Sequence, residues 1–375
     1  MAVERRIWLA RPQVDEAEIA EIREVLASGW LTQGPKVAEF ESMVAEQVGV
    51  PHAFAVTSAT TALQLSLAAL GIGPGDEVLV PDFTFPATAN VVVQQRAQPV
   101  LVDIDAATFA IDPTDLAAKI TPRSRAIIPV HPFGLPADMD PIMDLAADHG
   151  LAVIEDAACA LAAEYAGRQA GSIGLAGCFS FHPRKSITTG EGGMITTSND
   201  AFADRVRLLR NHGGARSGGR YVFEEAGFNY RLSDILAAVG VAQMRKLDLM
   251  LDARRRVAAW YDEALDVAGL DWVQRPRVPD GRRHTYQSYV VLLDPQVDRD
   301  EVIAILAGAG IETTLGTYAL HAQPFFARAY GFSPGDIPHS FRAFTGSLAL
   351  PLHPGIGADE VAFVISELTS ALRRS

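Results

Sequence analysis

Short apolar runs alternate with amphipathic helical segments along the chain from about residue 53 onward. Such alternation is typical of a sheet built from strand–helix–strand units, and runs that are apolar throughout predict parallel strands buried on both faces. Seven segments have strand character, and the first is followed by a helical segment at 60–70. The predicted strands are residues 53–58, 77–81, 99–105, 125–131, 151–156, 177–182 and 192–198.

The pattern changes after residue 200, where helical segments dominate through about residue 268 before a mixed α+β pattern begins at SYVVLLD. We therefore expect an α/β fold in which a mostly parallel seven-stranded sheet lies between helices. A large domain is predicted for residues 1–248, including the N-terminal segment, and a smaller α+β domain for residues 249–375. The glycine-rich segment 214–220 is the best candidate for a mobile loop.

Composition narrows the class of protein. About half of the 375 residues are apolar, and the formal charge is −13, which argues against binding nucleic acid or an anionic membrane surface. The two cysteines, Cys159 and Cys178, lie beside apolar runs and do not predict a disulfide. With neither a signal-peptide pattern nor an apolar stretch of membrane-spanning length, we expect a cytoplasmic protein.

The most informative segment is FSFHPRKSITTGEGGM, where a predicted strand ends in a loop that bears Lys185 and then a glycine cluster. A lysine whose amine is neutral can form a Schiff base with a carbonyl cofactor. A single loop lysine is more often an ordinary solvated residue, because charged side chains are seldom buried. The interpretation of Lys185 therefore depends on the residues that accompany it.

Three other segments accompany Lys185. Asp156 ends a predicted strand, where such sheets bind ligands, and its carboxylate could keep a pyridine nitrogen protonated. Thr60 and Thr61, at a strand-to-helix junction, offer backbone amides and hydroxyls to a phosphate. Phe85 could lie flat on an aromatic cofactor. Each feature alone has an ordinary explanation, as a helix cap or as core packing.

Taken together, the motifs resemble the DegT/StrS family of sugar aminotransferases, which belong to the fold type I pyridoxal-phosphate (PLP) enzymes. The resemblance covers nearly the whole chain in the family's order. Its motifs are LTQGPKVAEFE, SATTAL, GIGPGDEVLVPDFTFPATAN, PVLVDID, AIIPVHPFG, PADMD, VIEDAA, FSFHPRKSITTGEGGM, GFNYRLSD and SLALPLHPGI.

The resemblance implies that Lys185 holds PLP as a Schiff base and acts as general base once released, while Asp156 faces the pyridine nitrogen. It also implies a homodimer with shared active sites, in which Asn229 and Arg231 reach the neighbouring subunit's site. The implied cofactor contacts are Thr60, Thr61, Phe85, Asp156, Cys159, Ser180, Lys185 and Asn229. The implied substrate contacts are Thr32, His131, His212, Arg231 and His321.

Two positions depart from the family pattern. Ala59 stands where the family commonly has glycine, so the phosphate loop carries an additional methyl group. Cys159 stands where the family usually has glutamine or histidine against the cofactor's phenolic oxygen, and a thiol is a weak hydrogen-bonding partner.

The reaction implied is a ping-pong transamination. L-glutamate would convert the cofactor to pyridoxamine phosphate, and a nucleotide-linked 3- or 4-keto deoxysugar would then accept the amino group. A keto-cyclitol aminotransferase that uses L-glutamine remains an alternative. Lys185 argues against a related sugar dehydratase, in which histidine replaces the lysine, and Lys185 with Asp156 argues against a non-catalytic PLP-binding regulator.

Other cofactors find no support in the sequence. GIGPGD follows a helix and precedes a strand, which is the reverse of the order in a dinucleotide-binding motif. The nine histidines form no HExxH pattern and the two cysteines lack metal-ligand spacing. We therefore expect neither a nicotinamide cofactor nor a metal.

Overall fold

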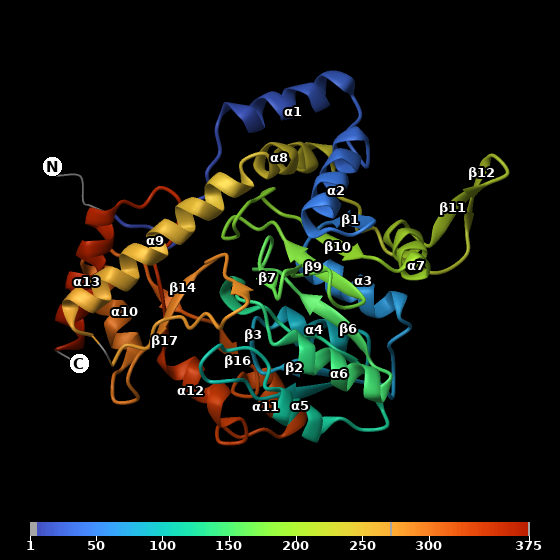
Figure 1. Ribbon diagram of the computed structural model, residues 1–375. Helices are drawn as coiled ribbons and strands as arrows, with labels where there is room; N and C mark the ends of the chain where they lie inside the picture. Colours follow the sequence, from blue (N-terminus) through green and yellow to red (C-terminus); the bar gives the residue numbers. More distant parts are fainter. Residues whose placement is uncertain (1–5, 271, 374–375) are drawn as a thin grey trace.

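The computed structural model describes residues 6–270 and 272–373, and a seven-stranded sheet lies at its centre (Figure 1). The strand order is β1-β10-β9-β6-β5-β2-β4. Strands β9, β6, β5, β2 and β4 are parallel, whereas β10 is antiparallel to both of its neighbours. The bounds are β1 His52–Val56, β2 Glu77–Pro81, β4 Gln98–Val102, β5 Ser124–Ile127, β6 Ala152–Asp156, β9 Ala176–Ser180 and β10 Gly193–Thr197. All seven predicted strands are confirmed, as is the mostly parallel sheet.

Helices cover both faces of this sheet. Helices α3 (Ala59–Ala69), α4 (Ala87–Gln94) and α7 (Asp200–Arg210) pack on one face. On the other face lie α2 (Pro35–Val48), α5 (Pro113–Lys119) and α6 (Met139–His149). Helix α8 (Asp234–Met244) covers α2 from outside, and α1 (Glu16–Ser28) lies along α8 (Figure 1).

The C-terminal part of the chain builds a second core. It contains strands β14 (Tyr289–Leu292), β15 (Thr314–Leu315) and β17 (Ser347–Leu350), with helices α10 (Arg299–Gly308) and α13 (Ala358–Leu372). Helix α9 (Leu247–Ala268) spans both cores, because Leu251 packs in the core of α2 and α8 whereas Tyr261 packs in the second core. Ile7 also lies in the second core. The domain boundary at residue 248 stays a prediction.

Short elements complete the fold. The connecting elements are β3 (Phe83–Thr84), η1 (Pro132–Gly134), β7 (Glu164–Tyr165), β8 (Arg168–Gln169), β13 (Arg282–Arg283), β16 (Tyr318–Ala319), α11 (Pro324–Tyr330) and α12 (Pro338–Gly346). Strand β16 pairs with β3 and so joins the C-terminal part to the edge of the large sheet. None of the described helices combines the length and the apolar character that crossing a membrane requires.

The segment predicted as a loop, residues 214–220, forms part of a β-hairpin instead. Strands β11 (Gly214–Ser217) and β12 (Arg220–Phe223) pair antiparallel and project away from the body of the molecule (Figure 1). Gly218 and Gly219 both have positive φ, at 57° and 79°, which is the geometry of a two-residue hairpin turn that favours glycine. The glycine pair is therefore a turn signal between two short strands.

Close helix packing depends on Gly240, in the middle of α8. A Cβ atom added at Gly240 would lie 2.8 Å from the ring of Phe40 in α2. Alanine normally stabilises a helix interior relative to glycine, but this overpacking costs about 1–3 kcal/mol. We expect Gly240→Ala to lower the free energy of unfolding, measured by urea titration at a fixed protein concentration. Gly308→Ala, at the exposed end of α10 with open space around it, is the matched control and should be neutral or stabilising. A stabilised Gly240→Ala variant would contradict this account of the α2–α8 contact.

Candidate active site

Lys185 lies in the loop between β9 and β10. The loop folds back on itself: the Lys185 N–H donates to the His182 carbonyl at 2.9 Å, and the Thr189 N–H donates to the Phe181 carbonyl at 3.0 Å. Gly190 has φ of 84°, a conformation that L side chains rarely adopt. These local contacts fix the backbone on both sides of Lys185.

Asp156 ends β6, the neighbour of β9 in the sheet, and is 6% exposed. Its Oδ2 accepts from the Thr88 hydroxyl at 2.8 Å and its Oδ1 accepts from the Ala158 N–H at 3.2 Å. Burial raises the pKa of Asp156, and the two hydrogen bonds and the nearby Lys185 amine only partly offset this. The carboxylate thus lies in a site that favours an additional positive partner.

Cys159 brings the lysine and the carboxylate into one site. The Lys185 Nζ lies 3.1 Å from the Cys159 Sγ, three residues beyond Asp156 in the chain. The lysine side chain therefore turns toward the end of β6. The three predicted cofactor contacts Lys185, Asp156 and Cys159 lie together, although their roles toward a cofactor stay predictions.

The start of α3 faces the same edge of the sheet. Ser58 caps the helix by accepting from the Thr61 N–H at 3.1 Å, and the Thr61 hydroxyl is bonded back to Ser58. The N–H groups of Ala59 and Thr60 donate to no described residue. The methyl group of Ala59 is thus accommodated at the first helical position, with two amides left for an anion. Ser180, at the end of β9, is partly exposed.

Phe85 follows β3 and is 64% exposed, although Thr84 before it is buried. Its ring contacts Tyr318 edge-on, at 6.5 Å between centroids. An exposed aromatic ring is available to stack on a planar ligand.

His131 and His321 are both fully buried beside carboxylates. The Nδ1 of His131 accepts from the Ala137 N–H at 3.0 Å, so its Nε2 carries the proton and donates to Glu155 at 2.9 Å. The Nδ1 of His321 bonds Asp82 at 2.6 Å, and its Nε2 donates to the Pro334 carbonyl at 3.2 Å. Burial works to lower the pKa of His321, but Asp82 and this carbonyl raise it overall. Both rings therefore have their nitrogens occupied by protein groups.

The remaining predicted contacts have no hydrogen bond to Lys185. Thr32, His212 and Asn229 are exposed. Thr32 pairs with Ser233 near the start of α8, and Asn229 pairs with Asn211 at the base of the hairpin. The Arg231 guanidinium donates to the Asn211 side chain. Arg231 also pairs with Val56, at the end of β1. The roles of these residues as substrate or cofactor contacts stay predictions.

Sequence reasoning missed three residues that hold the site. Thr88 positions Asp156. Gln243 in α8 accepts from the Thr188 N–H at 3.2 Å and donates to the Gln13 carbonyl at 2.7 Å. Arg254 in α9 donates to the Lys185 carbonyl at 3.2 Å. A signal for Arg254 was available, because it occupies an apolar-face position of the helix between Leu251 and Ala258.

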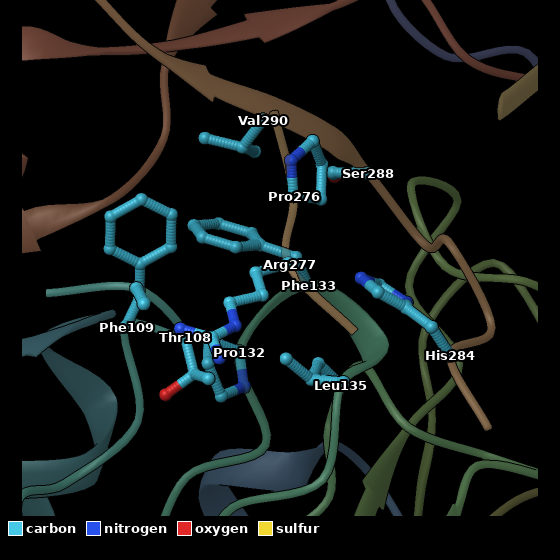
Figure 2. Close-up of a pocket in the computed structure, with 11 residues that line it drawn as sticks. Thr108, Phe109, Pro132, Phe133, Leu135, Pro276, Arg277, His284, Ser288 and Val290 are labelled. Carbon is cyan, nitrogen blue, oxygen red and sulfur yellow. The ribbon is translucent and has the colours of Figure 1, made fainter. Parts of the chain in front are cut away.

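A small cavity seen in Figure 2 is separate from this site. It lies between the loop of Phe109, η1 and the segment that leads into β14, and it is lined by Ala107, Thr108, Phe109, Pro132, Phe133, Leu135, Pro276, Arg277, His284, Ser288 and Val290. None of the predicted site residues lines it. Among the described residues, no group of three or more His, Cys, Asp or Glu side chains is arranged to hold a metal ion.

A lysine after β9 and a buried carboxylate at the end of β6, in this sheet order, define a fold type I PLP-dependent aminotransferase. The model of the DegT/DnrJ/EryC1/StrS aminotransferase family matches residues 12–369, and the chain belongs to that family. The resemblance drawn from the sequence motifs is thereby confirmed.

Three relatives illustrate the likeness. GDP-perosamine synthase of Caulobacter vibrioides is 43% identical over 370 residues, which cover 98% of each chain. The solved structure of the aminotransferase TlmJ from Streptoalloteichus hindustanus has a TM-score of 0.93 at 35% identity and covers 99% of this chain and 100% of that one. Spr1654 from Streptococcus pneumoniae, solved in its PLP form, has a TM-score of 0.94 at 28% identity and covers 99% of both chains.

The enzymes of this family use PLP, and the residues present fit that cofactor. The amine of Lys185 is the group that would hold it, and the buried Asp156 carboxylate would receive the pyridinium N–H that its site favours. The free amides of Ala59 and Thr60 would receive the phosphate, and the exposed ring of Phe85 would face the pyridine.

Thr88 should control cofactor affinity through Asp156. Thr88→Val removes a hydrogen bond to a charged group, worth about 1.5–3 kcal/mol, so PLP binding should weaken about 10- to 100-fold. Losing this bond also raises the pKa of Asp156 further, so binding should begin to fail at a higher pH as the solution is acidified. The measurement is a PLP titration of the cofactor-free protein across pH, followed by absorbance. Thr88→Ser keeps the hydroxyl and should behave like the wild type; equal affinities for all three proteins would contradict the role given to Thr88.

Proposed function

We propose that the protein transfers an amino group from L-glutamate to a nucleotide-linked 3- or 4-keto deoxysugar. The observation that carries the proposal is the Lys185–Asp156 site in a chain that is 43% identical, over 98% of its length, to a GDP-perosamine synthase. The name of that relative denotes a GDP-linked amino sugar, so GDP-linked keto-deoxysugars are the first acceptors to test.

The side chains of the site have separate tasks in this reaction. When bound, PLP supplies a carbonyl carbon for the amino group and a ring that takes up electrons from the reacting carbon. Asp156, held by Thr88 and the Ala158 N–H, keeps the pyridine nitrogen protonated. The released Lys185 Nζ moves the proton between substrate and cofactor, and the Cys159 Sγ at 3.1 Å is the neighbour that limits where the amine lies.

The half-reaction with the donor tests the function directly. L-glutamate added to the PLP-loaded enzyme should bleach its visible absorption, and a keto-deoxysugar should restore it. Lys185→Ala should fold normally but lose turnover by about 10³-fold or more, because the group that moves the proton is gone. The control is Lys119→Ala, which should retain activity. The Lys119 ammonium bonds Asp115 and the Leu101 carbonyl on the far edge of the sheet.

The acceptor is identified by a panel of GDP-, UDP- and dTDP-linked 3- and 4-keto deoxysugars, with product mass as the readout. Bleaching by L-glutamine in place of L-glutamate, with turnover of a keto-cyclitol only, would favour the alternative substrate class. Bleaching by neither donor would refute the proposed donor chemistry.

We also propose that the enzyme works as a homodimer whose subunits share active sites. Large apolar side chains are exposed on the face that carries Phe85, on the hairpin and after α1: Phe85 is 64%, Phe223 65% and Trp30 60% exposed. The side chain of Asn229, at the base of the hairpin, contacts no other described side chain through a hydrogen bond and is exposed. A second copy would cover these groups.

Mixed dimers test whether Asn229 serves the neighbouring site. Asn229→Asp places a negative charge where a cofactor phosphate is expected and should inactivate the site that it faces. Equal mixing of Lys185→Ala and Asn229→Asp subunits makes half of the dimers mixed, each with one intact site of two. Activity should then recover to about a quarter of the wild-type value. Two inactive parents that give an inactive mixture would show that Asn229 serves its own chain.

The cytoplasm remains our proposal for where the enzyme works. Cys159 and Cys178 are both free thiols, and a reducing compartment would keep them so.

A further inference from the structure

Arg254 is a buried cation without a carboxylate partner. It lies inside α9 and is 3% exposed. Its guanidinium donates only to carbonyl groups, namely those of Lys185 at 3.2 Å, Gln287 at 3.2 Å, Leu352 at 3.3 Å and Tyr286 at 3.4 Å. It forms no ion pair with any described residue.

Such a cation is costly to bury. Burial lowers the pKa of Arg254 to about 10, so the side chain is still positively charged at neutral pH. Buried charges in proteins are normally paired, because the carbonyl dipoles that solvate them carry no net charge. Glu360 lies close enough to act on the charge of His353, but it does not pair with Arg254. It caps α13 by accepting from the Gly357 N–H at 3.0 Å. The described residues therefore supply no counter-charge for Arg254.

Arg254 lines a small cavity between the N-terminal segment and the Lys185 loop. The cavity has a volume of about 10 Å³, which is room for one particle of about the size of a water molecule. It is lined by Arg11, Pro12, Gln13, Lys185, Ser186, Ile187, Thr188, Gln243, Met250, Arg254 and Pro354, with no Asp or Glu among them.

Several hydrogen-bond donors around this cavity are unpaired. The Nε of Arg254 and the hydroxyl of Ser186 are buried and have no hydrogen-bonding partner among the described residues. The backbone N–H groups of Ser186 and Ile187 likewise donate to no described residue. The carbonyls of Gln13 and Lys185 already accept from Gln243 and Arg254. A bound water could also pair with these groups, but it carries no net charge, whereas an anion accepts from them and balances the Arg254 guanidinium.

We propose that this cavity binds a single monatomic anion, chloride in the cell, with Arg254, Ser186 and Arg11 as its partners. The anion supplies the counter-charge for Arg254 and takes up the unpaired N–H and O–H groups. Because Ser186 and Ile187 directly follow Lys185 in the chain, the bound ion stabilises the loop that carries this lysine. This anion site is separate from the proposed cofactor site, and its occupancy does not depend on which substrate the enzyme uses.

Halide-dependent stability tests the site. The PLP-loaded enzyme is used, so that the phosphate site is already filled and cannot take the halide. At constant ionic strength, replacing sodium gluconate by sodium chloride should raise Tm along a saturable curve by about 2 °C or more, and bromide should act similarly. Gluconate is too large for the cavity and serves as the inert anion.

Two variants and a crystal locate the effect. Ser186→Ala keeps Arg254 and should shift the half-saturating chloride concentration upward several-fold, whereas Arg254→Met should abolish the chloride response. Arg256→Met removes an exposed guanidinium from the same helix and should respond like the wild type. Bromide-soaked wild-type crystals should show an anomalous peak in the cavity, a result that holds even if Arg254→Met fails to fold. Tm values equal in chloride and gluconate, or a water molecule in the cavity with bromide present, would overturn the proposal.

Discussion

The active site depends on the parallel pairing of β6 with β9. Asp156 lies opposite Cys178 in that register, so the carboxyl ends of both strands reach the same edge of the sheet. The carboxylate is the last residue of one strand, and the loop with Lys185 begins just after the other. Two residues 29 positions apart in the chain thus come into one site because the strands that precede them are hydrogen-bonded neighbours.

Glu155 and Asp156 end β6 and differ in their surroundings, because successive side chains of a strand point to opposite faces of the sheet. Glu155 accepts from the Gly171, Ile173 and Gly174 N–H groups and from His131, so its charge is fully used in holding a turn. Asp156 has only two hydrogen bonds and a raised pKa, and so is left with capacity for a cationic ligand. Both carboxylates are buried, so what distinguishes them is how completely their oxygens are hydrogen-bonded within the chain.

The sequence was sufficient to predict the seven strands, because apolar periodicity is a local signal. Strand ends also singled out Lys185 and Asp156, whose roles stay predictions. The sequence did not reveal Thr88 or Gln243, since their partners are 68 and 55 residues away and neither stands out in its own segment. The sequence predicts a loop where the structure has the hairpin turning at Gly218 and Gly219, because two four-residue strands are too short to show alternation. His131 and His321 lie in motifs that predict substrate contacts. Their burial against Glu155 and Asp82 has no signal in the sequence, because it arises only in the folded chain.

The Lys185 loop is also the place where three parts of the chain meet. Gln243 bonds it to the N-terminal segment at Gln13, and Arg254 bonds it to the C-terminal part at Gln287 and Leu352. Each of these bonds is weak alone, but all must be satisfied at once in a buried region, where an unpaired polar group costs about 1–3 kcal/mol. Movement of either part relative to the sheet would therefore break contacts at the Lys185 loop. The place of Lys185 at this junction makes its position sensitive to the packing of all three parts.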